Sequence, residues 1–374
     1  MSFRNQTEIP FSFQTDDAFV GLLYTIVSIL CCCFQLIMLH VLYFDADLRR
    51  VPAYSIMFHL GLADVVQLIF HTFSGIFVVF QTTFHPWLEK ICGALINTGC
   101  VVYTPLTMLL AINRFVVICC PPNMQSPLFS IQTTKIWITL IWLYGCCFFL
   151  CYISPLVTVF FDPSIYMWGH VGRLAKFIHD AEFYAALIEL CVTTILYMAV
   201  VLALVSKRRF VSITRSSLQH CELRILIQAM TISFFIGFVL FTWYNFDSFF
   251  IQTKWTFFLV NMMWILNCGI NPILYLVLNR TIRRKYAIFF NRYFGCNFKS
   301  ATSDLSAQSI TKQMVAIYDN INKISTNRPR MFTIINIKPQ LWDKLDFSSC
   351  IVATRLLNTQ PKVLLEHSVS HCTI

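Results

Sequence analysis

The stretch Trp264–Arg283 reads WILNCGINPILYLVLNRTIR, and its apolar part is as long as a membrane-crossing helix. Such a helix needs about 20 mostly apolar residues to cross the hydrocarbon core of a bilayer. Pro272 frees a backbone carbonyl inside this run, and a neighbouring polar side chain can satisfy that carbonyl. Asn271 directly before the proline and Tyr275 one turn later therefore predict a kinked, polar hinge. A simple proline kink is the alternative.

Six comparable apolar runs precede this one along the chain. Together the seven runs cover roughly residues 18–44, 53–80, 91–119, 135–160, 181–205, 225–250 and 256–279. Charged residues make up only 12% of the 374 residues and hydrophobic residues 57%, whereas a soluble domain is about 25% charged. Short connections make neighbouring helices antiparallel within one bundle. The sequence therefore predicts an all-α membrane protein, with a seven-transmembrane helix bundle over residues 18–280, and excludes an ordinary soluble protein.

Basic residues set the expected orientation of the bundle. Fourteen Lys and Arg residues follow spans one, three, five and seven, against five on the opposite side. By the positive-inside rule, residues 1–17 are extracellular and the C-terminus is cytoplasmic. This rule also accounts for the formal net charge of +10, so no nucleic-acid partner is expected. The sequon Asn5-Gln6-Thr7 then lies outside, where Asn5 can be glycosylated. The expected location is the plasma membrane, with a sensory cilium as one candidate site.

Residues 281–296 have the pattern of an eighth helix that lies on the membrane surface. Its apolar side chains share one face, and its basic side chains point toward the lipid headgroups. The apolar face consists of Ile282, Tyr286, Phe289, Phe290 and Tyr293. Cys296 follows as a candidate palmitoylation site, with an unmodified cysteine as the alternative. Residues 297–374 are rich in Ser, Thr and Asn and predict a cytoplasmic tail that is mostly disordered.

Two ionisable residues lie in or at the end of apolar runs. LGLADVVQL (Leu60–Leu68) places Asp64 inside span two, where an ionisable residue must find partners within the bundle. Asn267 and Asn271 are suitable partners, and the carboxylate can hold a sodium ion or a proton, or merely fix the helix register. No other cofactor is expected. MLLAINRF (Met108–Phe115) ends span three with Arg114, which functions at the cytoplasmic surface or merely snorkels to the interface.

Taken together, Asp64, Arg114 and the Asn271–Tyr275 motif resemble the rhodopsin-like G-protein-coupled receptors in their spans and their order. With ILIQAMTIS (Ile225–Ser233), the chain looks most similar to nematode serpentine chemoreceptors, with class T the nearest, over about residues 18–295. The resemblance implies a receptor that binds a ligand near the outer face and meets a heterotrimeric G protein when span six swings outward. It assigns the coupling and switch roles to Asn113, Arg114, Tyr197, Asn271, Pro272 and Tyr275. It also implies that Trp243 is an aromatic toggle at the floor of the pocket.

Three positions depart from the family pattern. Asn113 stands where an acidic residue usually precedes the arginine, so Arg114 is expected to be less restrained and basal signalling to be higher. Asn245 stands where span six usually has a proline. Cys92 tops span three, but residues 161–180 contain no cysteine, so no disulfide is expected to hold the second outer loop. Interactions of other side chains are expected instead, from His170, Arg173, His179 and Asp180.

Few charged side chains occur in the outer halves of spans two to seven. The polar or aromatic pocket candidates are His71, Asn97, Glu182, Glu189, Trp243 and Asp247. A structural role explains each of them at least as well as ligand contact does. Glu189, in the middle of span five, must be protonated, paired with His71, or facing a cationic ligand. Because Ile96 stands where amine receptors carry an aspartate, a biogenic amine is disfavoured. An apolar pocket with a few polar side chains suits a small odorant-like molecule, with a short peptide as the alternative.

Two other classes of membrane protein compete with a chemosensory G-protein-coupled receptor. A membrane transporter predicts broken helices at the middle of the membrane, yet only Pro105, Pro155 and Pro272 lie well inside the runs. A seven-helix receptor that does not couple to G proteins is the other alternative, because of Asn113. No metal-ligand or catalytic motif occurs in a favourable context, so no enzyme is expected. The expected partners are a small-molecule ligand, a heterotrimeric G protein and membrane lipid.

Overall fold

The computed structural model describes residues 15–210, 230–231, 233–243, 251 and 253–294. Four residues with an expected role, Asn5, Asn245, Asp247 and Cys296, lie outside these ranges, as does the expected tail 297–374. The expectations attached to them stay predictions.

Six helices of the described residues are long and apolar enough to cross a membrane. They are α1 (Thr15–Phe44), α3 (Pro52–Phe80), α4 (Pro86–Cys119), α6 (Ile131–Ile153), α7 (Ala175–Phe210) and α10 (Lys254–Leu278). Within the predicted sixth span, the structure describes a shorter apolar helix, Ser233–Trp243. Two short helices, α2 (Ala46–Arg49) and α5 (Pro122–Leu128), lie in connections between the long helices, and α11 (Arg280–Phe294) follows α10.

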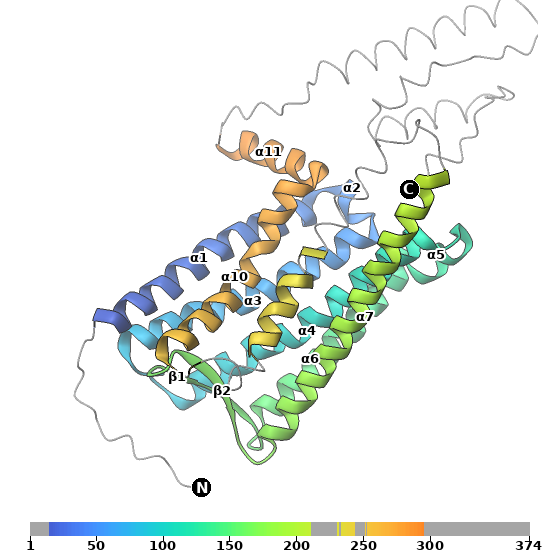
Figure 1. Cartoon of the computed structure of the whole chain (residues 1–374). Coiled ribbons are helices and arrows are strands. Elements are labelled where there is room, and N and C mark those ends of the chain that lie inside the picture. The colour runs from blue at the N-terminus through green and yellow to red at the C-terminus, as the bar shows by residue number, and fades with distance from the viewer. Residues whose placement is uncertain (1–14, 211–229, 232, 244–250, 252, 295–374) are drawn as a thin grey trace, which may run out of the picture. The chain divides into compact units, whose positions relative to one another are not determined.

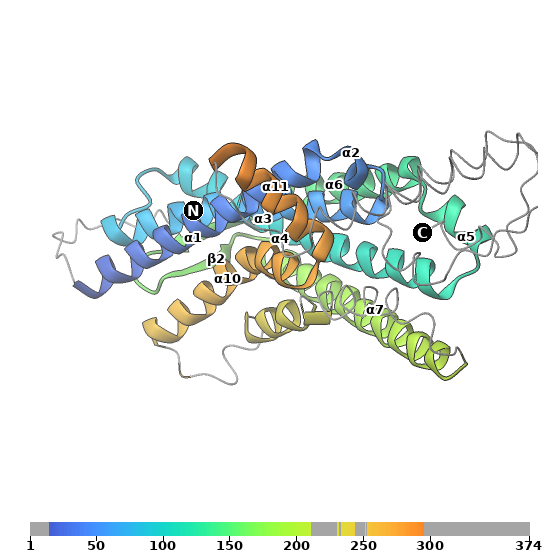
Figure 2. The same ribbon diagram turned by 90° about the horizontal axis from the view of Figure 1, so that it is seen from above.

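The long helices pack side by side as one bundle (Figures 1 and 2). Helix α1 packs along α3 and α10, and α4 packs against α3, α6 and α7. Gly21 and Gly75 let α1 and α3 approach closely, because a Cβ atom at Gly75 would lie 2.5 Å from the carbonyl oxygen of Gly21. Small residues at such crossings are typical of helices that pack within membranes.

Apolar side chains also cover the outer surface of the bundle. Ile188, Ile195 and Leu202 recur at intervals of seven residues on one face of α7, and each is more than 60% exposed. A soluble protein rarely exposes so continuous an apolar face, whereas lipid covers it at no cost. The described helices are therefore those of a multi-pass membrane protein.

The fourth span is shorter than the sequence predicted. We expected a helix to about residue 160, but α6 ends at Ile153, and Ser154 is extended with φ −64° and ψ 161°. Pro155 explains this, since a proline disfavours the helical conformation in the residue before it. The chain beyond forms an antiparallel hairpin of β1 (Thr158–Asp162) and β2 (Met167–Val171), in which Phe160 is opposite Gly169. The sequence analysis missed this hairpin.

The hairpin lies at the end of the bundle where α1 begins, and α2 and α5 lie at the opposite end (Figure 1). We call these two ends the hairpin end and the Arg114 end. Helix α4 runs between them and begins at Pro86, before the expected residue 91. Proline at the first turn needs no hydrogen-bonded N–H, and the preceding His85 caps the helix by accepting a hydrogen bond from the backbone N–H of Trp87.

Candidate functional site

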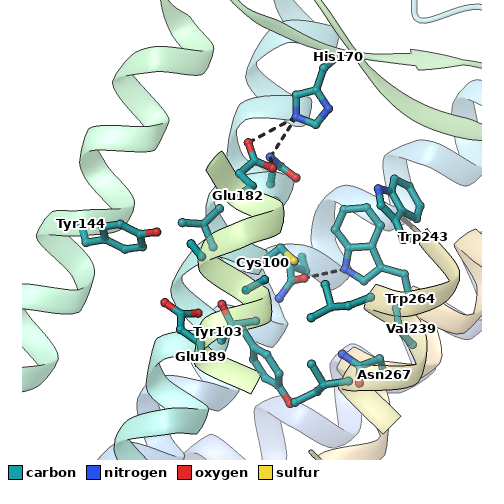
Figure 3. A pocket seen from close by; sticks show the side chains of 18 residues that line it. Cys100, Tyr103, Tyr144, His170, Glu182, Glu189, Val239, Trp243, Trp264 and Asn267 are labelled. Carbon is teal, nitrogen blue, oxygen red and sulfur yellow. Dashed lines mark hydrogen bonds and ion pairs between the residues drawn. The ribbon is translucent and has the colours of Figure 1, made fainter. Parts of the chain in front are cut away.

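The described residues enclose a cavity of about 60 Å³ inside the bundle (Figure 3). Its walls come from α3, α4, α6, β2, α7, the Ser233–Trp243 helix and α10. The polar and aromatic side chains that line it are Gln67, Asn97, Tyr103, Thr104, Tyr144, His170, Glu182, Glu189, Trp243, Trp264 and Asn267. Elements far apart in the sequence therefore meet around one internal space.

Four of the predicted pocket residues, Asn97, Glu182, Glu189 and Trp243, line this cavity. His71 does not: its ring is fully buried against Trp264, with the ring centroids 4.9 Å apart. Among the described residues, neither ring nitrogen of His71 has a hydrogen-bond partner. The pairing of His71 with Glu189, one of three alternatives considered, is thus not the observed arrangement.

A buried polar cluster closes the cavity toward the hairpin end. Glu182 accepts hydrogen bonds from the Tyr152 hydroxyl at 2.6 Å and from Asn97 Nδ2 at 3.0 Å. His170, from β2, lies close to both Glu182 and Asn97. Its Nε2 is 3.6 Å from Glu182 Oε1 and 3.3 Å from Asn97 Nδ2 (Figure 3). Tyr152 was not predicted, because it lies in an apolar run where only its hydroxyl sets it apart.

Glu189 follows Glu182 by about two helical turns along α7 and borders two cavities. Its neighbour on α4 is Thr104. A second cavity of about 10 Å³ extends from Glu189 toward Thr193 and Ser233, which is near the minimum space for one water molecule. The Ser233 hydroxyl is buried and has no hydrogen-bond partner among the described residues.

Two tryptophans form another part of the cavity wall. The rings of Trp243 and Trp264 meet edge to face, with centroids 5.0 Å apart. Trp264 Nε1 donates a hydrogen bond to Gln67 Oε1 at 2.8 Å, so its indole is held in place. Asn267 lines the cavity below them and is 7% exposed, and its Oδ1 accepts no hydrogen bond from the described residues.

Asp64 is fully buried at the centre of a second polar network. Its Oδ2 accepts hydrogen bonds from Asn271 Nδ2 at 2.7 Å and from Gln35 Nε2 at 3.0 Å. Asn271 Nδ2 also donates to the Tyr103 hydroxyl at 2.8 Å. The sequence analysis predicted Asn271 as a partner of Asp64 and missed Gln35 and Tyr103. Asn267, the other predicted partner, lines the cavity instead.

Three oxygens of this Asp64 network have no hydrogen-bond partner among the described residues. They are Asp64 Oδ1, Gln35 Oε1 and Asn271 Oδ1. Carboxylate and amide oxygens suit a hard cation, and an unpaired carboxylate oxygen also suits a proton. The side chains present therefore fit both occupants considered for Asp64.

Three of the six predicted switch residues, Arg114, Tyr197 and Tyr275, come together at the Arg114 end. Tyr197 of α7 is buried and packs against Ala111 of α4. Arg114 interacts electrostatically with both Tyr197 and Tyr275 of α10. Neither tyrosine hydroxyl has a hydrogen-bond partner among the described residues. Arg114 thus stands between two helices whose hydroxyls are available for new contacts.

Backbone contacts, rather than a disulfide, hold the hairpin on α4. Glu89 Oε1 accepts a hydrogen bond from the Phe161 backbone N–H at 2.9 Å. Lys90 Nζ donates to the Ser154 carbonyl at 2.7 Å. At Gly93 the two backbones nearly touch, since a Cβ atom there would lie 2.1 Å from the Val159 carbonyl oxygen. Cys92, between them, is a buried free thiol.

Further contacts tie the hairpin to α1 and α3. The Tyr166 hydroxyl donates to Asp17, and Trp168 Nε1 donates to the Ser74 hydroxyl at 3.0 Å. Of the four side chains expected to hold this loop, His170 does so through Glu182. The His179 ring packs edge to face against His170, with the centroids 5.4 Å apart. Arg173 is exposed, and Asp180 lies beside its neighbour His179 at 3.8 Å. The sequence analysis missed the other anchoring points, many of which are backbone groups that carry no sequence signature.

Comparison with family models matches residues 5–294 to the serpentine type 7TM GPCR chemoreceptor Srt. No curated protein matches the chain. The family match covers every described helix, the cavity and both polar networks, and it confirms the resemblance drawn from Asp64, Arg114 and the Asn271–Tyr275 motif. The chain therefore belongs to the Srt family of serpentine seven-transmembrane chemoreceptors.

Proposed function

We propose that this protein is a chemosensory receptor that binds a small molecule in the internal cavity and signals through a heterotrimeric G protein. One observation carries the proposal. The cavity is bounded by α7, the Ser233–Trp243 helix and α10, and those elements are the ones whose relative movement the family's mechanism requires. A molecule in this space touches all three at once.

A ligand changes the state of such a bundle only if it binds one packing better than another. Tyr103 supports a route for this effect, because it lines the cavity and also accepts a hydrogen bond from Asn271. Asn271 holds Asp64, and four residues further along α10 lies Tyr275, an electrostatic neighbour of Arg114. A shift of Trp243 against Trp264 is a second route into α10.

The Asp64 network is proposed to tune this equilibrium by holding a sodium ion or a proton. The oxygens of Asp64, Gln35 and Asn271 that lack partners support the proposal. Gln35 lies on α1, Asp64 on α3 and Asn271 on α10. A movement of α10 relative to α1 and α3 would separate these oxygens, so the network would hold a cation in one packing of the helices and not in the other.

The proposed orientation places the hairpin end outside and the Arg114 end in the cytoplasm, at the plasma membrane or in a sensory cilium. The basic residues that follow the odd-numbered spans support this orientation. Helix α11 fits a surface position on the cytoplasmic side, because Ile282 and Tyr286 are buried whereas Arg283 and Arg284 are exposed. Glycosylation at Asn5 and palmitoylation at Cys296 agree with this orientation.

The test is a compound screen on cells that express the full chain together with a promiscuous G protein, with nucleotide exchange as the readout. We expect at least one small molecule to drive exchange, and Arg114→Ala to abolish it while leaving surface expression and ligand binding intact. Ligand uptake into vesicles without nucleotide exchange would identify a transporter. Binding without either would identify a receptor that does not couple to G proteins.

A further inference from the structure

We infer that the ligand of this cavity is a small organic amine, bound as its ammonium ion by Glu189. The inference rests on the proposed function, because it names the chemical class that the proposed receptor detects. It depends on four features of the cavity: the acidic charge of its lining, the availability of Glu189, the aromatic walls and the small volume.

The charged groups that line the cavity are acidic. Two carboxylates, Glu182 and Glu189, line it, and the described lining contains no lysine or arginine. Asn267 Oδ1 is a further acceptor, buried and without a partner among the described residues. Two of the lining donors are already engaged: Trp264 Nε1 bonds Gln67, and Asn97 Nδ2 bonds Tyr152 and Glu182. A ligand that carries a positive charge matches this lining, and an anion does not.

Of the two carboxylates, Glu189 is the one available to a ligand. Glu182 already accepts hydrogen bonds from Tyr152 and Asn97 and lies 3.6 Å from His170. Among the described residues, Glu189 bonds the Thr104 side chain of α4, has Cys100 and Tyr144 as electrostatic neighbours, and borders the two cavities. A carboxylate at this depth is costly unless a cation or a proton neutralises it. An ammonium ion supplies both the opposite charge and hydrogen-bond donors.

The remaining walls suit a cation with a small apolar body. Trp243, Trp264 and Tyr144 present aromatic rings, on whose faces an ammonium group binds favourably (Figure 3). Val101, Ile236, Val239 and Leu240 complete an apolar part of the lining. A cavity of about 60 Å³ has room for about four to six water-sized groups. This limits the body of the amine to a single ring or a short aliphatic chain.

The placement of the carboxylate differs from that in receptors with an aspartate on the third span. Ile96 of α4 is buried and apolar in this chain and brings no charge. Here the carboxylate comes from α7. The sequence argument against biogenic amines concerned the wall formed by α4, and the present proposal concerns the opposite wall.

The experiment uses the purified full chain in lipid nanodiscs and matched pairs of probes with the same carbon skeleton. The pairs are isobutylamine with isobutanol and cyclopentylamine with cyclopentanol, whose heavy atoms match the size of the cavity. Thermal unfolding is followed against probe concentration, since a ligand that binds only the folded state raises the unfolding temperature by mass action. We expect the amines to stabilise the wild-type protein at concentrations at least about tenfold lower than the alcohols.

Three variants assign the effect to its residue. Glu189→Gln keeps the size of the side chain and removes its charge, so it should weaken amine binding at least about tenfold. Glu189→Asp keeps the charge and should retain the preference for amines over alcohols, which preserves the test if the Gln variant folds poorly. Asp180→Asn is the matched control, because it removes one negative charge from the same helix at an exposed position outside the cavity, and it should leave amine binding unchanged.

The inference is overturned if the alcohols stabilise the protein as well as the amines do, if Glu189→Gln binds amines normally, or if no probe of either kind stabilises it. Its failure is distinguishable from that of the proposed function. Amine binding at Glu189 without nucleotide exchange would support the inference and contradict the proposed G-protein coupling. Nucleotide exchange driven by the alcohols and not by the amines would contradict the inference and support the proposed coupling.

Discussion

Tyr103 and Asn271 are joined by a hydrogen bond of 2.8 Å between Asn271 Nδ2 and the Tyr103 hydroxyl. Tyr103 belongs to the wall of the cavity, and Asn271 belongs to the network around Asp64. This bond is therefore the direct polar connection between the candidate ligand site and the buried centre of the bundle. Its removal should separate ligand binding from signalling.

Tyr103→Phe removes the hydroxyl and leaves the ring in the cavity wall. We expect a loss of about 0.5–1.5 kcal/mol in stability, as for a typical buried hydrogen bond. We also expect a raised basal rate of nucleotide exchange with ligand affinity changed by less than a few fold, because Asn271 loses one of its two restraints. Tyr144→Phe, which also alters a ring of the cavity wall, is the control. Equal basal exchange in the two variants would disprove the connection.

Asn113 is buried, with 2% exposure, directly before Arg114. Asn113→Asp places a carboxylate beside the guanidinium and restores the ion pair that restrains the arginine in related receptors. We expect basal nucleotide exchange to fall and the exchange driven by ligand to persist. Asn113→Leu, which is similar in size and uncharged, should not lower basal exchange. If the Asp variant has the basal activity of the wild type, Asn113 does not set the resting level.

Glu89 should determine how firmly the hairpin is held. Glu89→Ala leaves the Phe161 backbone N–H without its acceptor, at a cost of about 1–3 kcal/mol. Hydrogen–deuterium exchange in nanodiscs should then be faster at Phe161 and its neighbours in β1. Glu89→Gln keeps a side-chain oxygen as acceptor and should preserve most of the protection. Unchanged exchange in the Ala variant would show that Lys90 and Gly93 hold the hairpin without Glu89.

Asp45 and Lys285 join the first connection of the chain to α11, with Lys285 Nζ 2.6 Å from Asp45 Oδ2. Burial alone would raise the pKa of Asp45, but hydrogen bonds from Lys285 and from the backbone N–H of Leu48 lower it below the ordinary value of 3.8. Burial would lower the pKa of Lys285, yet the bond to Asp45 raises it above 10.5. Both shifts favour the charged pair in the folded protein.

The pH dependence of stability follows from these two directions. The contribution of Asp45 is complete above pH 3.8 and is lost as the pH falls through its lowered pKa. The contribution of Lys285 is complete below pH 10.5 and is lost as the pH rises through its raised pKa.

Asp45→Asn keeps the cap of α2 and removes the charge, so it should cost about 1 kcal/mol or less at neutral pH. In thermal unfolding, that difference from the wild type should shrink as the pH falls below 3.8 and vanish below the lowered pKa of Asp45. A difference that persists there would rule out the ion pair as its source.

Much of the architecture was predictable because a bilayer imposes a simple length rule. About 20 apolar residues are needed for each crossing, and the six long helices that the structure describes lie where the apolar runs predicted them. The resemblance based on Asp64, Arg114 and the Asn271–Tyr275 motif was confirmed by the family match. Each of these features is local: a run of residues, or a motif at a fixed spacing on one helix.

The early end of the fourth span also has a local cause. Pro155 lies in the predicted fourth span, and the helix stops before it. The residues beyond form a hairpin because Gly93 leaves space for the β1 backbone and Glu89 supplies an acceptor for it. A prediction from average hydropathy does not distinguish the apolar side chains of β1 from those of a helix, and it therefore placed them in the fourth span.

The amino-acid sequence by itself determined the membrane class, the receptor family and the helices that carry the switch residues, because hydropathy and motif spacing are properties of single segments. Only the tertiary structure decided the partners: Gln35 for Asp64, Tyr103 for Asn271, Tyr152 for Glu182, and Thr104 rather than His71 for Glu189. A polar side chain inside an apolar run must find a partner on another helix. Which partner it meets depends on how the helices rotate and cross, and close packing at residues such as Gly21 and Gly75 sets that geometry.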